Sequence, residues 1–414
     1  MSKKTAYIII IIFVLVLAGG FLAFFFYTNR GQGNNIIVPA EKINIFPASP
    51  TPSAEKNSPN DKPNEDDKTS QIDDTSKAIL KELSMRPSAG GVALATSTSR
   101  GVTVRFLDKG DGKVYDVNTD DNEEIRVSNT TIAKTVEAIW NKDGTKVIAR
   151  HIGDDPDSIK TYSASLIAKN ADQTSGTLQG SYLSDNIKML TASPDKNKIF
   201  YQLVGSGGST GIISDFDGTK KTGLMDSPLG ELLLDWSNAS TIALTTKPAA
   251  GIPGFLFFLN SKTGATTRVI SRIEGLTTLV SPSASEILYS ESGQNGFYLK
   301  VYSTKTGSAV DTAIATLPEK CIWSKTNSSI IYCSVPSYLP DTGLPDSWYK
   351  GLISFSDDIW KIDASTGAGE IIAKLKDTSG KNIDGVNLML SQNEDYLFFT
   401  NKKDYHLWSL KLRE

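Results

Sequence analysis

The stretch AIWNKDGTKVIAR at residues 138–150 decides the fold, because its pattern returns along the rest of the chain. Each copy has an apolar strand, often ending in Trp, then a turn that begins with Ser or Asn, then a second apolar strand. The other copies are LTASPDKNKIFYQ (190–202), LLDWSNASTIALT (233–245), TLVSPSASEILYS (278–290), CIWSKTNSSIIYC (321–333) and LMLSQNEDYLFFT (388–400). Most follow one another at about 40 to 50 residues, the length of a four-stranded propeller blade.

The segments between these copies supply the remaining strands of each blade. Alternating strands flank turns rich in Thr, Gly and Lys in FLFFLNSKTGATTRVI (255–270), LKVYSTKTGSAVDTAI (299–314) and IWKIDASTGAGEIIAK (359–374). More strands precede the first copy, at 91–97 and 102–128, and a helical period is almost absent after residue 90. We therefore expect an all-β propeller of seven blades, or of six if the first strands only complete the last blade. A strand from the N-terminal side should close the ring.

Composition and charge narrow the classes of function. The chain has 43 Lys and Arg against 46 Asp and Glu, a formal net charge of −3, so the surface as a whole is unsuited to nucleic acid. Two cysteines exclude a disulfide scaffold and a four-thiolate zinc site. The two histidines, His151 and His406, leave little material for imidazole chemistry. We expect no metal, no cofactor and no enzymatic activity.

The first 30 residues predict a membrane anchor. Residues 5–27 read TAYIIIIIFVLVLAGGFLAFFFY without a charge, long enough as a helix to cross a bilayer. This apolar run is longer than the core of a cleaved signal peptide, and its best cleavage candidate lies inside it. Lys3 and Lys4 precede the run and Arg30 follows it, so the positive-inside rule places the N-terminus in the cytoplasm. The remainder of the chain should be extracytoplasmic.

A polar stalk follows the anchor and leads to the propeller domain. Residues 31–76 are rich in Pro, Asp and Ser and hold too few large apolar residues to offset their ordering entropy. We expect a disordered linker there and a propeller over 77–414. The segment TSKAILKELS (75–84) predicts a short helix at the start of that domain, docked through its apolar residues.

The turns resemble those of a known family. WNKDG (140–144) and SPD (193–195) resemble the repeat of TolB-like propellers, which look related to WD-repeat proteins. The segments 128–140 and 345–363 are also similar to a group of membrane-anchored bacterial propeller proteins. These resemblances cover about residues 88–414 and imply the fold and the location, but they bring no chemistry with them. The Asp-Gly pair of the repeat is retained in full only at Asp143 and Gly144.

One long insertion offers candidate binding residues. It follows the second strand of the blade that begins with CIW, and it carries Tyr338, Asp346, Trp348 and Tyr349. Long loops on rigid scaffolds commonly carry recognition, and Trp and Tyr are frequent binding anchors. The alternative is that these rings pack over the rim of the propeller.

The two cysteines lie in the same blade, in two strands that should pair. If the hairpin is centred on Asn327, Cys321 faces Cys333 across antiparallel strands, at a separation within or near the disulfide range. A disulfide and a pair of buried thiols both remain open.

One string matches a catalytic motif, since Gly207 to Gly211 fits G-x-S-x-G. A nucleophile elbow needs a helix after the serine, whereas a strand and a turn follow here, so the string indicates a glycine-rich hairpin. We therefore expect a recognition or scaffold module that binds a protein or a component of the cell envelope. The alternative is a propeller enzyme that acts on glycans or peptides through carboxylates in the central channel.

Overall fold

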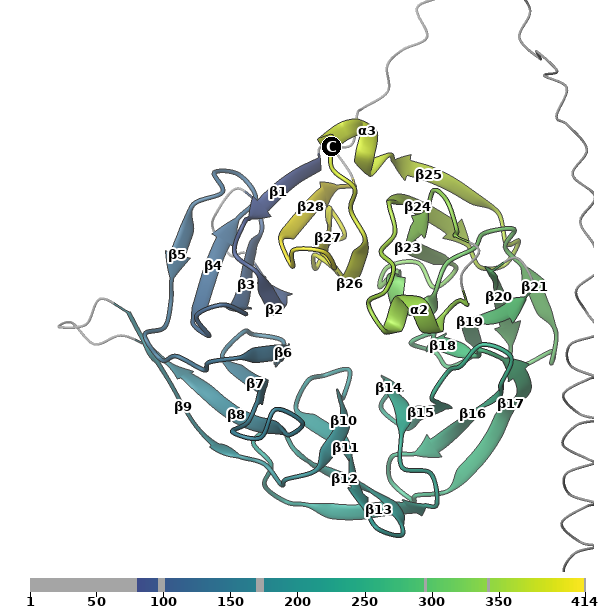
Figure 1. Cartoon of the computed structure of the whole chain (residues 1–414), viewed down its shortest axis with the longest axis horizontal. Coiled ribbons are helices and arrows are strands. Elements are labelled where there is room, and N and C mark those ends of the chain that lie inside the picture. Colours follow the sequence, from purple (N-terminus) through teal and green to yellow (C-terminus); the bar gives the residue numbers. More distant parts are fainter. Residues whose placement is uncertain (1–79, 96–100, 169–174, 294–295, 341–342, 413–414) are drawn as a thin grey trace, which may run out of the picture. The chain divides into compact units, whose positions relative to one another are not determined.

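The computed structural model of the protein describes residues 80–95, 101–168, 175–293, 296–340 and 343–412. Within them the chain forms seven four-stranded antiparallel sheets arranged as blades around a ring (Figure 1). The expected all-β propeller with seven blades is therefore confirmed, and the six-blade alternative is wrong. No helix in these ranges is long and apolar enough to cross a membrane. The predicted anchor at 5–27 and the stalk at 31–76 lie outside the described residues.

The strands run from the centre of the ring outward within each blade. The first three blades are β2 (Ser88–Ala93), β3 (Thr103–Asp108), β4 (Val114–Asn118), β5 (Glu124–Arg126); β6 (Thr135–Trp140), β7 (Lys146–Ile152), β8 (Ile159–Ile167), β9 (Thr177–Tyr182); and β10 (Ile187–Ala192), β11 (Lys198–Gly205), β12 (Gly208–Asp215), β13 (Thr222–Ser227). The fourth and fifth are β14 (Leu232–Asn238), β15 (Thr241–Thr246), β16 (Pro253–Asn260), β17 (Thr266–Glu274); and β18 (Thr277–Val280), β19 (Glu286–Gly293), β20 (Gly296–Ser303), β21 (Ala309–Asp311).

The last two blades carry the short helices. The sixth is β22 (Cys321–Trp323), β23 (Ile330–Pro336), β24 (Asp357–Asp363) and β25 (Gly369–Ala373), preceded by the 3-10 helix η2 (Pro318–Lys320). The seventh is β26 (Gly385–Leu390), β27 (Tyr396–Asn401), β28 (Leu407–Lys411) and β1 (Leu80–Ser84). Helix α2 (Asp346–Tyr349) lies in the loop between β23 and β24, and α3 (Leu375–Ser379) follows β25.

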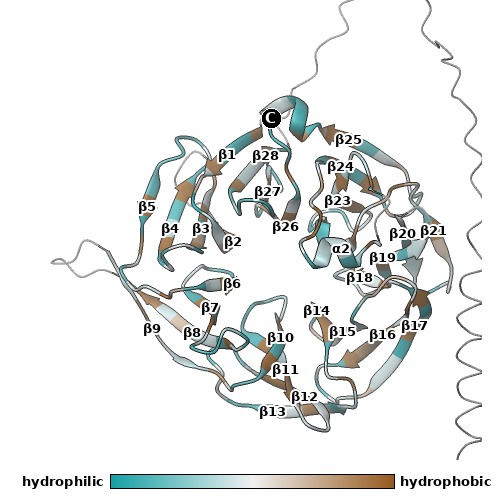
Figure 2. Cartoon of the chain, viewed as in Figure 1, coloured by the Kyte–Doolittle hydropathy of each residue, from teal (hydrophilic) through white to brown (hydrophobic). Residues whose placement is uncertain are grey.

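Burial explains why the second strand of each blade is the most apolar segment. Residues 147–150 of β7, 199–202 of β11 and 287–290 of β19 are four consecutive buried positions, whereas the outermost strand β5 is fully exposed. A second strand is covered by the neighbouring blade on each face, so both sets of alternating side chains are buried. Figure 2 shows hydrophobic residues on the strands around the ring and hydrophilic ones along many of the turns. Trp140 and Trp323 join blades directly, because each indole Nε1 donates to a carbonyl of the preceding blade.

The N-terminal strand closes the ring. β1 pairs with β28, with Leu80 opposite Leu410 and Glu82 opposite Trp408. The prediction of a short helix at the start of the domain is wrong for residues 80–84. The residues ILKEL have a local preference for a helix, but without them the outer edge of β28 would be left unpaired. The hydrogen bonds gained by pairing with β28 outweigh that preference, so the segment forms a strand.

Candidate functional site

The insertion between β23 and β24, here residues 337–356, positions the candidate site. It lies on the side of the ring that carries the loops between second and third strands and the connections between blades, which we call the insertion face. Figure 1 shows α2 reaching from the sixth blade toward the centre of the ring. Asp346, at the start of α2, accepts a hydrogen bond of 2.6 Å from the backbone N–H of Ala250 in the fourth blade. The insertion therefore contacts a loop two blades away.

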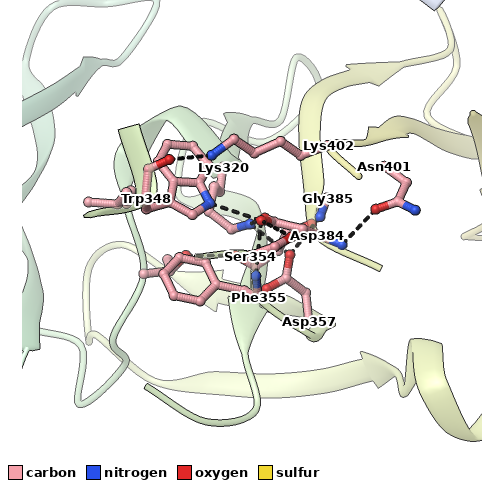
Figure 3. A network of polar contacts seen from close by, with 12 residues as sticks. Lys320, Trp348, Ser354, Phe355, Asp357, Asp384, Gly385, Asn401 and Lys402 are labelled. Carbon is pink, nitrogen blue, oxygen red and sulfur yellow. Dashed lines mark hydrogen bonds and ion pairs between the residues drawn. The ribbon is translucent and has the colours of Figure 1, made fainter. Parts of the chain in front are cut away.

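Trp348 anchors the insertion to the seventh blade. Its side chain is buried, and Nε1 donates to Asp384 Oδ2 over 2.9 Å (Figure 3). The indole stacks on Phe355 with 6.1 Å between ring centroids, and Lys402 Nζ lies 3.7 Å from the indole centroid. A Lys ammonium over an indole face is attracted by the ring quadrupole. Trp348 is thus held in place by contacts within the protein.

A buried ionic group lies beneath this tryptophan. Lys320 Nζ donates to Asp357 Oδ2 over 2.7 Å and also to Asp384, and all three side chains are fully buried (Figure 3). Burial raises the pKa of Asp357 to about 6, against the opposing charge of Lys320. The pKa of Asp384 is lowered: burial acts to raise it, but the charge of Lys320 and several hydrogen bonds together outweigh that effect. Each carboxylate needs the single ammonium as its partner, so the three groups act as one unit.

Tyr349 and Glu319 form a second, less enclosed pair. The Tyr349 hydroxyl donates to Glu319 Oε1, which η2 holds next to α2, and the Tyr349 side chain is 39% exposed. Burial raises the pKa of the Glu319 carboxyl. Burial and the neighbouring charge of Glu319 also raise the pKa of Tyr349. In the described part of the chain, Glu319 Oε2 is buried with no hydrogen-bond partner. The pair therefore combines a phenol at the surface with a carboxyl group able to hold a proton behind it.

The four residues predicted from the insertion have different environments. Asp346, Trp348 and Tyr349 lie together on α2, whereas Tyr338 is 76% exposed, and no hydrogen bond or ring contact is found for it among the described residues. Glu319, Lys320, Asp357 and Asp384 were not predicted, because they come from three separate segments and form no motif in sequence.

The structure also describes two other features noted in the sequence, the G-x-S-x-G string and the pair of cysteines. Ser209 of the G-x-S-x-G string lies in β12, buried, and its Oγ donates to the carbonyl of Leu229 over 2.6 Å. Cys321 lies opposite Cys333 in the β22–β23 register, and the two are joined by a disulfide. Within the described ranges, no group of three or more His, Cys, Asp or Glu side chains could hold a metal ion.

Of the comparisons with known proteins, only the one with solved structures finds similar proteins. No protein-family model matches the sequence, and no curated protein matches it. The structure is similar to oligogalacturonate lyase from Vibrio parahaemolyticus, with TM-score 0.55, 10% identity, and coverage of 83% of this chain and 96% of that one. It is also similar to the propeller domain of the Trilobed protease from Pyrococcus furiosus (TM-score 0.47, 10% identity, coverage 78% and 94%). A puromycin hydrolase gives TM-score 0.47 and 14% identity over 75% of this chain and 50% of that one.

The similarity to the oligogalacturonate lyase, at TM-score 0.55, supports the propeller fold. The oligogalacturonate lyase, an enzyme aligned over almost its whole length, corrects the expectation that the protein has no enzymatic activity. Lack of a familiar motif in a propeller sequence is therefore no argument against catalysis.

Proposed function

We propose that the protein is a propeller enzyme that cleaves glycans, with its reacting groups on the insertion face. The observation that carries the proposal is the pair of Tyr349 and Glu319, in which a partly exposed phenol donates to a carboxyl group whose pKa is raised by burial. A general acid works best when its pKa lies near the working pH, and burial moves the pKa of the Glu319 carboxyl in that direction. Cleavage of a glycosidic bond requires such a proton on the leaving oxygen.

Each residue has a distinct role in this proposal. Tyr349 gives its proton to the glycosidic oxygen as the bond to the anomeric carbon breaks, and takes a proton from Glu319, which also orients the phenol. A water molecule adds to the anomeric carbon and gives its proton to Asp346. Asp346, on the same helical turn, supplies a second carboxylate toward the fourth blade. Trp348 and the buried ionic group of Lys320, Asp357 and Asp384 hold α2 in position without touching the substrate.

The choice of glycan over peptide rests on the fold neighbour that is itself a single propeller. The oligogalacturonate lyase acts on a glycan with the ring as nearly its whole chain, whereas the puromycin hydrolase is matched over only half its length. We also propose that residues 5–27 anchor the chain in a membrane, with the propeller outside, so that a glycan of the cell envelope is the substrate and partner. Membrane fractionation and protease accessibility of intact cells test this location.

The activity is tested on a panel of acidic and neutral oligosaccharides, with peptides as a parallel set. We expect new reducing ends from at least one glycan, and a loss of about 100-fold or more for Y349F and for E319Q, the usual range for removing an acid–base group. Y298F is the matched control, because Tyr298 is also exposed, 49%, but lies on β20. Cleavage of peptides alone, or equal rates for Y349F and Y298F, would contradict the proposal.

A further inference from the structure

The buried ionic group beneath α2 brings an amine into direct contact with two carboxyl groups. Lys320 Nζ contacts Asp384 Oδ1 and lies 2.7 Å from Asp357 Oδ2, and none of the three side chains has exposed surface. The rings of Trp348 and Phe355 lie beside the ammonium, with their centroids 5.4 Å and 5.3 Å from Nζ (Figure 3). The amine and both carboxyl groups are therefore held together in a site closed to solvent.

The two oxygens of Asp384 have different surroundings. Oδ2 accepts hydrogen bonds from Trp348 Nε1 over 2.9 Å, from Ser354 Oγ over 3.0 Å and from the backbone N–H of Phe355 over 3.0 Å. Oδ1 accepts from Lys320 Nζ instead. Donors that converge on one oxygen stabilise the negative charge that it gains when a nucleophile adds to the carbon beside it. Asp384 is thus arranged to accept a nucleophile at Cγ, with Oδ1 as the oxygen that can leave.

Asp357 is placed to move protons in this site. Its Oδ2 accepts from Lys320 Nζ and, over 2.6 Å, from the backbone N–H of Gly385, the residue after Asp384. Its Oδ1 is buried and has no hydrogen-bond partner in the described part of the chain. Burial raises the pKa of Asp357 to about 6. A carboxyl group with a pKa near neutral pH can both accept a proton and return it.

The closed site also favours joining the amine to a carboxyl group. In water, hydration stabilises the separate ammonium and carboxylate ions and so opposes formation of an amide. Taking both ions out of water is unfavourable, and a neutral amide removes the two charges. A contact fixed by the fold raises the effective concentration of the two groups far above that of free reactants. Both effects favour an amide between Lys320 and Asp384 once the chain has folded.

We propose that Lys320 and Asp384 form an intramolecular isopeptide bond, with Asp357 as the proton carrier. The ammonium first gives one proton to Asp384 Oδ1, which leaves a neutral amine and a neutral acid. Lys320 Nζ then bonds to Asp384 Cγ, and negative charge develops on Oδ2. Asp357 takes the second proton from the nitrogen and passes it to Oδ1, which leaves as water when the Cγ–Oδ1 bond breaks. No oxidant, reductant or cofactor is needed.

The bond joins the end of η2, before the sixth blade, to the segment that enters the seventh blade 64 residues further along the chain. None of the three residues meets the substrate in the proposed glycan cleavage, so the cross-link does not depend on that activity.

Peptide mapping by mass spectrometry of the folded, full-length chain tests the bond, after reduction and alkylation of the disulfide. Trypsin needs a positively charged side chain at its cleavage site and does not cut after an amidated lysine. We therefore expect residues 306–325, uncut at Lys320, to be joined to residues 382–402, with the sum of the two peptide masses less one water. Cleavage after Lys320 with a free 382–402 peptide, or a link to residues 351–361, which contain Asp357, would overturn the proposal.

Three variants separate the roles of the residues. K320R keeps the positive charge but lacks the amine, so the 382–402 peptide should be free. D357N keeps the size of the side chain and removes the proton carrier, so the linked fraction formed in a given time should fall at least 10-fold. D358N, one position along the same strand, is the matched control and should keep the wild-type linked fraction. Thermal unfolding identifies the variants that fold, and a folded D357N with the wild-type linked fraction would overturn the role of Asp357.

Discussion

Trp348 Nε1 and Asp384 Oδ2 lie 2.9 Å apart, so a side chain from the middle of the sixth-blade insertion is bonded to the segment that enters the seventh blade. Asp384 also accepts from Lys320 and from the backbone N–H of Phe355, which brings η2 and the insertion together on one carboxylate. Without the Asp384 carboxylate, α2 would be held only by the hydrogen bonds of Tyr349 and Asp346 and by the Lys402 contact to the Trp348 carbonyl. The position of the proposed reacting groups therefore depends on a buried polar centre beneath them.

Replacing Trp348 by Phe should loosen the insertion. The change removes a hydrogen bond to a charged group and weakens the Lys402–indole contact, for an expected loss of about 2–3 kcal/mol in the free energy of unfolding. Denaturant titration gives the loss, and hydrogen exchange over 337–356 shows where it falls. W408F is the matched control, since the buried Trp408 Nε1 has no partner among the described residues. Equal losses in both variants would mean that the polar contacts of Trp348 contribute nothing.

Asp357 should make stability depend on pH in an unusual direction. Its pKa is about 6 in the folded protein, against an ordinary value of 3.8 for a free aspartate, so between these values the folded state holds the extra proton. This contribution to stability is complete below pH 3.8 and is lost as the pH rises through 6, about 3 kcal/mol in all. D357N removes the titration, so the stability of the wild type relative to D357N should fall from pH 4 to pH 6.

The neighbouring Asp358 provides the control for this measurement. It accepts a hydrogen bond from Ser337 and lies one position along the same strand, outside the Lys320 group. Denaturant unfolding at several pH values should give D358N the same slope as the wild type. A D357N variant that keeps the wild-type slope would show that Asp357 is ionised throughout this range.

The residues that could be predicted from sequence are those fixed by local pattern. Trp140 and Trp323 mark first strands because every blade repeats the same strand, turn and strand, and the pairing of Cys321 with Cys333 follows from the centre of one hairpin. Lys320, Asp357 and Asp384 could not be found in this way, since their meeting depends on how two blades and an insertion pack. The helix expected at 75–84 fails over 80–84 for a related reason: the partner of that segment, β28, lies at the other end of the described chain.

The disulfide between Cys321 and Cys333 should contribute to stability through the unfolded chain. Joining residues 12 positions apart limits the unfolded ensemble, which on the chain-entropy model is worth about 3 kcal/mol. C321A/C333A should lose about this amount in denaturant unfolding. A reductant should destabilise the wild type and leave the variant unchanged. Titration of two free thiols in the unfolded, unreduced wild type would contradict the disulfide.

Closure of the ring by β1 leads to the last prediction. Leu83 of β1 is buried in a cluster with Phe398 and Leu407, and Glu82 Oε1 lies 2.7 Å from Nδ1 of His406, the residue before β28. A chain that begins at residue 78 keeps these contacts, whereas one that begins at residue 86 leaves the outer edge of β28 unpaired.

The shorter chain should lose about 3 kcal/mol or more in the free energy of unfolding, because it lacks the buried leucine and the hydrogen bonds of β1. It should also associate with other copies through the free edge of β28. Thermal unfolding together with light scattering on a sizing column measures both effects. E82Q in the longer chain is the control, because it removes the carboxylate that bonds Lys381 and His406 and keeps the strand. Equal Tm and a monomeric state for both chains would mean that six complete blades and a three-stranded seventh hold the ring without β1.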